Sequence, residues 1–105
     1  MQIATGSLSF SKAKDAGPRT ANTTIVFPQN VKILQAVACL TGFSAEYSDN
    51  DGKEFGKLVV ELSCTTKENT VNVVGTYGLR DSGSEYDTDY QGTIYFAVLA
   101  NEAPT

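Results

Sequence analysis

The feature that most constrains the fold is an alternation of apolar and polar residues with a period of two. In residues 58–65 the even positions are apolar, and from residue 61 the odd positions are polar. In residues 71–79 the odd positions are apolar or small. Successive side chains of a β-strand point to opposite faces, so both segments predict half-buried strands. The polar residues 67–69 between them predict a hairpin with antiparallel strands.

Two other segments are apolar on both faces. Residues 31–47 carry apolar side chains at both parities in their first half, which indicates either a central strand or a strand interrupted by a bulge. The pair Thr41-Gly42 is the natural place for that bulge. Residues 92–100 form the last predicted strand, and its second face, with Tyr95 and Leu99, is available for a contact with another subunit.

The remaining signals are weaker but consistent with an all-β fold. Within residues 3–10, apolar or small residues alternate with serines, and residues 23–27 form a short β-branched run. We expect a polar loop at residues 12–22. About six strands with turn signals between them predict an antiparallel sandwich or barrel. There is no internal repeat or linker, so we expect one domain over residues 1–105.

Composition removes several classes of function. The 105 residues include no His and no Trp, which excludes mechanisms that need an imidazole base, and we expect no enzyme. The chain is acidic, with a net charge of −4 and 8 scattered basic residues, so we expect no nucleic-acid partner. No apolar run is long enough to span a membrane and no signal peptide is recognisable, so we expect a soluble chain without assigning a compartment.

Two cysteines, Cys39 and Cys64, are too few for a disulfide framework or a zinc site. The simplest interpretation is a pair of small buried side chains in a reducing compartment. A disulfide between them is the alternative, because both fall in predicted core strands. Position in a strand also predicts a raised thiol pKa.

The order of these segments resembles the H-type lectin family, with Phe27-Pro28 and Thr41-Gly42-Phe43 as its signposts. The resemblance implies a six-stranded antiparallel β-sandwich that commonly forms trimers and binds N-acetylgalactosamine or related sugars. The family's sugar site uses an acid, an arginine and an aromatic-histidine pair after the penultimate long strand. Residues 77–81 take that place here, but without His or Trp only the placement carries over.

The segment that follows is the most distinctive in the chain, because residues 80–90 combine acids, hydroxyls and tyrosines. Carboxylates accept hydrogen bonds from sugar hydroxyls, arginine donates them, and a tyrosine ring packs on the C–H face of a pyranose. An ordinary hydrophilic surface loop is the alternative. The candidate ligand-binding residues are Tyr77, Arg80, Asp81, Glu85, Tyr86, Asp87, Asp89 and Tyr90.

Calcium is a further candidate ligand for this segment, because its four acids are hard oxygen donors: Asp81, Glu85, Asp87 and Asp89. A second acidic cluster, residues 49–52, does not fit an EF-hand. The first ligand position there would be Tyr47 and the bidentate glutamate position would be Leu58. We therefore expect no required cofactor and no metal site.

The sequence thus predicts a non-enzymatic, lectin-like carbohydrate-binding module that acts through a homo-oligomer, with a trimer favoured. Several weak sites that engage one surface together bind more strongly than one site does. The alternative is a structural module that packs against copies of itself or another protein within a particle or larger complex, without sugar binding.

Overall fold

The structure, a computed structural model, describes residues 1–13, 17–47, 55–83 and 89–103. These residues form six strands and no helix: β1 (Gln2–Ala13), β2 (Arg19–Val26), β3 (Ile33–Tyr47), β4 (Phe55–Lys67), β5 (Thr70–Asp81) and β6 (Tyr90–Glu102). Within the described part of the chain, therefore, no helix is long and apolar enough to cross a membrane.

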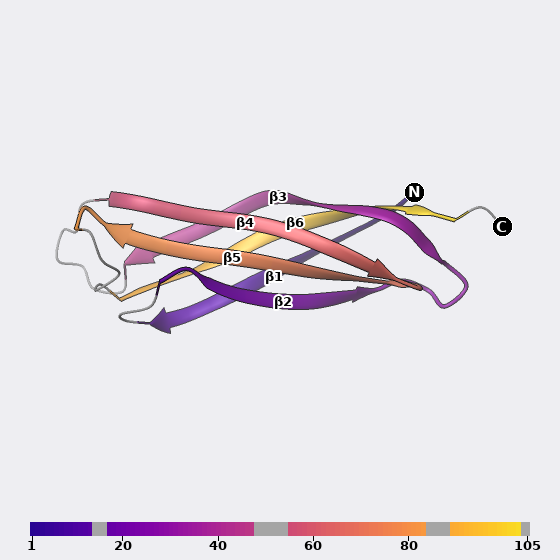
Figure 1. The fold of residues 1–105 in the computed structure, drawn as a ribbon, viewed down its shortest axis with the longest axis horizontal. Coiled ribbons are helices and arrows are strands. Elements are labelled where there is room, and N and C mark those ends of the chain that lie inside the picture. Colours follow the sequence, from indigo (N-terminus) through magenta and orange to yellow (C-terminus); the bar gives the residue numbers. More distant parts are fainter. Residues whose placement is uncertain (14–16, 48–54, 84–88, 104–105) are drawn as a thin grey trace.

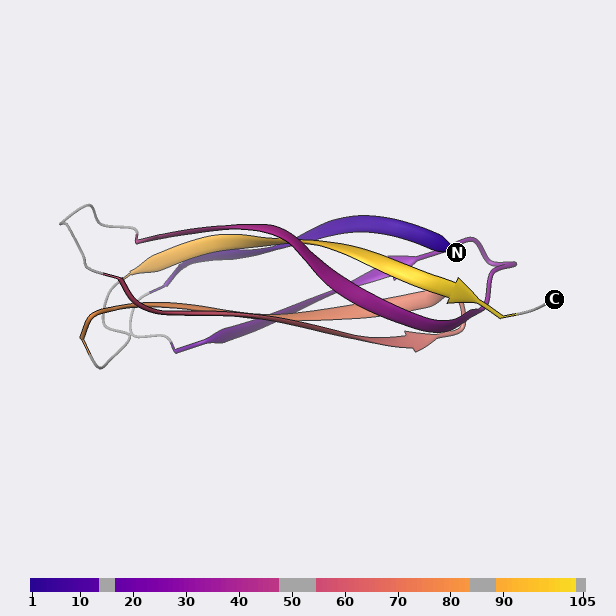
Figure 2. The same cartoon turned by 90° about the horizontal axis from the view of Figure 1, so that it is seen from above.

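The strands form two three-stranded antiparallel sheets that pack face to face (Figures 1 and 2). One sheet has the order β1-β6-β3 and the other β2-β5-β4, so β6 and β5 are the central strands. The predicted six-stranded antiparallel β-sandwich is confirmed. The molecule is elongated, 56 × 19 × 18 Å, because the strands are long and lie along one axis.

The predicted hairpin is confirmed by the pairing of β4 with β5. Phe55 pairs with Asp81 at one end of the ladder and Lys67 with Thr70 at the other. The turn between them is Glu68-Asn69, and Glu68 adopts a left-handed backbone conformation with φ 55°. The register places the alternating apolar side chains of both strands on the face that meets the other sheet.

The core lies between the two central strands. On β6 the side chains of Ile94, Phe96 and Val98 are completely buried, and on β5 those of Val71 and Val73 are too. The outward face of β6 carries side chains that are only partly covered. The two-faced apolar pattern of the last strand therefore reflects one core face and one outer face.

The sheet β1-β6-β3 shows how a long strand with two apolar faces is accommodated at an edge. The pairing of β3 with β6 shifts register between Leu40 and Gly42, which confirms the predicted bulge.

The polar loop expected at residues 12–22 is wrong, because β1 continues to Ala13 and β2 already begins at Arg19. The polar side chains of β2 point alternately outward, as an edge strand tolerates.

One end of the sandwich is tied by backbone hydrogen bonds between connections. The amide of Phe27 donates to the carbonyl of Asn69, and that of Ile33 to Glu68, each at 2.8 Å. The N-terminus lies toward this end (Figure 1). The opposite end is where β5 finishes and β6 begins, and it holds the described part of the predicted site.

Candidate functional site

The predicted ligand-binding residues are distributed over the end of β5 and the start of β6. Arg80 and Asp81 are the last two residues of β5, and Asp89 directly precedes β6. These three side chains are partly covered and lie at the same end of the sandwich. Glu85, Tyr86 and Asp87 lie outside the described residues.

Tyr77 and Tyr90 require a correction. Both were expected to contact a ligand, and Tyr90 to offer a ring face to a sugar, but both side chains are completely buried. Their rings pack edge to face with centroids 5.5 Å apart. The Tyr77 hydroxyl donates to the carbonyl of Gln91 and the Tyr90 hydroxyl to that of Gly17, each at 2.8 Å. Both tyrosines therefore belong to the core, since burial satisfies their rings and hydroxyls internally.

Arg19 is a residue of this end that the sequence did not single out. Its guanidinium lies over the ring of Tyr90 at 4.8 Å and over the ring of Phe10 at 5.8 Å. Nη2 also donates a 3.4 Å hydrogen bond to the carbonyl oxygen of Tyr90. A cation held over two aromatic rings is attracted by their π faces. The one signal in the sequence was the alternation along β2, which puts Arg19 on the same face as Ala21 and Ile25. In the structure Arg19 pairs with the inward-facing Tyr77.

Three buried side-chain atoms at this end have no hydrogen-bond partner among the described residues. They are Nε of Arg19, Nε of Arg80 and Oδ1 of Asp89. Two are donors and one is an acceptor. Buried polar atoms are nearly always hydrogen-bonded, so three such atoms at one end are unusual within the described part of the chain. Arg80 is also fixed by its backbone, whose carbonyl accepts a 2.8 Å hydrogen bond from the Tyr47 hydroxyl.

The electrostatics of this end are set mainly by burial and by the acids. The pKa of Tyr47 is raised by burial and by the nearby charge of Asp81. Oδ1 of Asp81 accepts a 2.9 Å hydrogen bond from the amide of Gly83, which is the self-contained turn expected of a surface loop. Oδ2 of Asp89 lies 3.4 Å from Nζ of Lys12. Asp81 is thus occupied in shaping its own loop, whereas Asp89 joins β1 to the start of β6.

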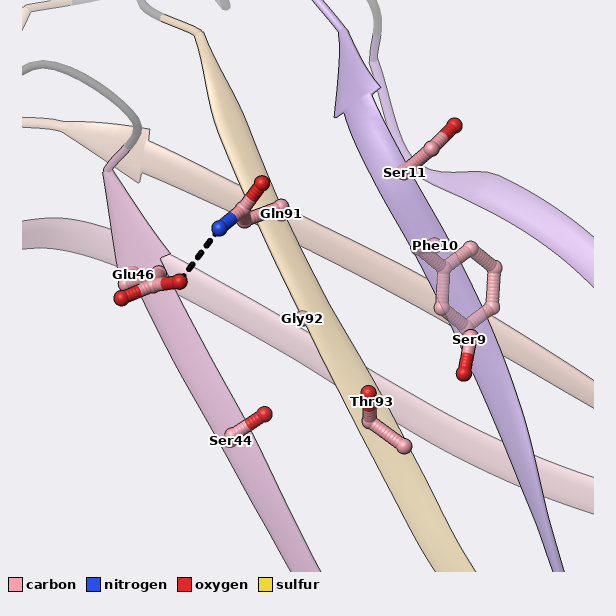
Figure 3. Close-up of a pocket in the computed structure, with 8 residues that line it drawn as sticks. All are labelled: Ser9, Phe10, Ser11, Ser44, Glu46, Gln91, Gly92 and Thr93. Carbon is pink, nitrogen blue, oxygen red and sulfur yellow. Dashed lines mark hydrogen bonds between the residues drawn. The ribbon is translucent and has the colours of Figure 1, made fainter.

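A depression of about 310 Å³ adjoins this end, on the outer face of the sheet β1-β6-β3 (Figure 3). The side chains of Glu46 and Gln91 point toward each other, and Nε2 of Gln91 donates to Oε1 of Glu46. Sequence reasoning missed this depression, because isolated serines on outward positions look like ordinary surface until the register aligns them. Its lining residues are Ser9, Phe10, Ser11, Ser44, Glu46, Gln91, Gly92 and Thr93.

Metal and thiol chemistry has little support in the described residues. No three His, Cys, Asp or Glu side chains among them gather into a group that could hold a metal ion. Two of the four acids considered for calcium, Glu85 and Asp87, lie outside that part of the chain.

Both cysteines are free, but Cys39 is exposed, so its expected burial is wrong. Cys64 is half-buried and its pKa is raised by burial, as expected for a strand position.

The chain has no match among known proteins in three comparisons. Protein-family models, curated proteins and solved structures were each compared with the chain. None of them matches it.

Proposed function

We propose that this chain is a non-enzymatic carbohydrate-binding module whose site lies at the end formed by Arg80 and Asp89. The observation that carries the proposal is the gathering there of buried donor and acceptor atoms without described partners, on Arg19, Arg80 and Asp89. A sugar hydroxyl both donates and accepts a hydrogen bond, so it matches a mixed set of guanidinium donors and a carboxylate acceptor. The order of the sequence segments, which resembles that of the H-type lectins, is consistent with this function.

Two residues of the binding end are also held by contacts with neighbouring strands, which favours recognition over adaptation. Arg80 is anchored through its carbonyl by Tyr47, and Asp89 through its ion pair with Lys12. The rings of Tyr77 and Tyr90 pack against each other in the core at this end. Groups that are already in position lose less conformational entropy when a ligand binds.

We propose further that the module acts as a homo-oligomer, with a trimer favoured. Support comes from a row of apolar side chains on the outer face of β1-β6-β3, in which Ile3 pairs with Leu99 and Leu99 with Val37. Ile3 is 66% exposed and Val37 is 53% exposed. Apolar neighbours of this kind mark interaction surfaces, and several linked sites raise the strength of weak sugar binding.

The same row favours the second candidate, a structural module that assembles with copies of itself or another protein and binds no sugar. Light scattering at micromolar concentration tests the oligomer that both candidate functions share. A stable oligomer is compatible with both functions. A monomer would contradict both the avidity mechanism and self-assembly.

A glycan array with the whole chain tests the proposal directly. The test variant is Arg80→Ala, and the matched control is Lys57→Ala, because Lys57 is the exposed cation that pairs with Arg80 across β4 and β5. We expect glycan binding by the natural chain and by the Lys57 variant, and its loss in the Arg80 variant. Asp89→Asn should weaken binding as well, since it removes the acceptor charge. Absence of binding to every glycan, with tight self-association, would overturn the proposal in favour of assembly.

A further inference from the structure

We infer that the depression on the outer face of β1-β6-β3 is a second saccharide subsite, so that the ligand is an oligosaccharide that runs from the Arg80–Asp89 end onto this face. The inference rests on the proposed function and names its substrate class. It is carried by the side chains that the register brings together and by their closeness along the strands to the first site.

The register gives the depression two rows of polar side chains. Ser9 of β1 pairs with Thr93 of β6, and Thr93 pairs with Ser44 of β3, so three hydroxyls lie side by side across the sheet. Glu46 and Gln91 form the next row. Neighbouring strands lie about 4.8 Å apart and same-face residues about 7 Å apart along a strand, which spreads these groups over the dimensions of a sugar ring.

The second row is arranged before any ligand binds. Gln91 donates to Glu46 through one N–H of its carboxamide (Figure 3). A carboxamide has a second N–H and a carbonyl oxygen, and a carboxylate has a second oxygen, so the pair keeps both donor and acceptor capacity for a ligand. The backbone of Gln91 is held from below by the hydroxyl of Tyr77. Side chains fixed in this way recognise a ligand at a lower entropic cost.

The depression lies close to the first site along the strands. Gln91 lies two residues after Asp89, and Ser11 directly precedes Lys12, the cation paired with Asp89. Two residues of extended chain, roughly 7 Å, therefore separate Asp89 from the Glu46–Gln91 pair. The volume of about 310 Å³ is at the small end of ligand pockets, which fits one further sugar ring rather than a long chain.

The other end of the same face has a different chemistry. A second depression there, of about 270 Å³, is lined by Met1, Val37 and Leu99 together with Gln35, Ala36 and Asn101. The row of Ile3, Leu99 and Val37 runs beside it. Hydroxyl-bearing and carboxyl-bearing side chains are thus concentrated at the end of the face next to the proposed sugar site. The polarity of the face therefore favours a polar ligand in the first depression only.

Calorimetry with two probes tests the inference. The probes are the glycan with the strongest array signal and its terminal monosaccharide. The test variants are Glu46→Gln, which removes the acceptor charge, and Thr93→Val, which removes a hydroxyl and keeps the shape. The control is Ser7→Ala, on the same face of β1 but outside the depression. Thr93→Ser retains the hydroxyl and tests for rescue, and thermal unfolding checks that each variant is folded.

We expect the oligosaccharide to bind more tightly than the monosaccharide, and each test variant to weaken oligosaccharide binding by roughly tenfold with the monosaccharide unchanged. The Ser7 and Thr93→Ser variants should bind as the natural chain does. Unchanged oligosaccharide binding in both test variants, with binding still lost in Arg80→Ala, would overturn this inference alone. No binding of any glycan by the natural chain would overturn the proposed function and this inference with it.

Discussion

The hydroxyl of Tyr77 donates a 2.8 Å hydrogen bond to the carbonyl oxygen of Gln91 and thereby joins the central strands of the two sheets. The bond crosses the core just beneath the point where the Gln91 side chain emerges on the outer face. Tyr77 therefore supports the polar depression from inside rather than contacting a ligand. Its removal should affect stability first and binding only through the position of Gln91.

Replacing Tyr77 with phenylalanine isolates that hydrogen bond, because the ring and its packing are retained. We expect the free energy of unfolding to fall by about 1–2 kcal/mol, since the carbonyl of Gln91 loses its cross-sheet donor in a buried setting. Urea denaturation measures the change. Tyr95→Phe is the control, because Tyr95 is 47% exposed on the outer face. Equal effects of the two substitutions would contradict a special role for the Tyr77 hydroxyl.

The same tyrosine predicts a loss of stability at high pH. Burial, followed by the nearby Tyr90, raises the pKa of Tyr77 from 10.0 to about 12. The folded chain thus holds this proton more tightly than the unfolded chain does, so the contribution is complete below pH 10.0 and is lost as the pH rises toward 12. The loss at pH 12 is on the order of 2 kcal/mol.

Denaturation midpoints measured from about pH 8 to pH 12 check this dependence. The natural chain should lose stability more steeply above pH 10.0 than the Tyr77→Phe variant, because the variant lacks the titrating group. The other four tyrosines are present in both chains. Parallel curves for the two chains would show that the Tyr77 proton is not linked to folding.

Gly92 is predicted to be intolerant of any side chain. A Cβ at this position would lie 2.3 Å from the backbone oxygen of Ser44 and 2.6 Å from the hydroxyl of Tyr77. Gly92→Ala should therefore lower the free energy of unfolding by about 1–3 kcal/mol, because backbone must shift to make room. Gly42→Ala is the matched control, since its nearest neighbour would be a side-chain atom of Tyr95 at 3.9 Å. Thermal unfolding of both variants should show a clear loss only for the Gly92 variant.

Most of the fold could be predicted from the sequence because most strands have a local pattern of alternating apolar and polar residues. Alternation gave the hairpin of β4 and β5 and the inward face of Val71 and Val73, and a glycine marked the bulge in β3. The start of β2 was missed, because an edge strand that carries Arg19 and threonines has the composition of a loop. Its pairing with β5 depends on a partner about 50 residues away.

The candidate site was less accessible, for a related physical reason. Tyr77 and Tyr90 look like sugar-stacking residues in sequence, and only the packing of two sheets shows that their rings meet each other in the core. Arg19 lies over the rings of Tyr90 and Phe10, which no local motif signals. The depression joins three strands that are far apart in the chain, so it exists only in the register of the sheet.

The two cysteines should differ in reactivity toward iodoacetamide. Cys39 is exposed on β3, whereas Cys64 is half-buried and its thiol contacts the carbonyl of Ala36 at 3.5 Å. Burial raises the pKa of Cys64, which lowers its fraction of reactive thiolate near neutral pH. Mass spectrometry over time should show one rapid addition, at Cys39, followed by a slow one. A Cys39→Ser variant should react slowly until urea unfolds it. Rapid modification of Cys64 in that folded variant would contradict its burial against β3.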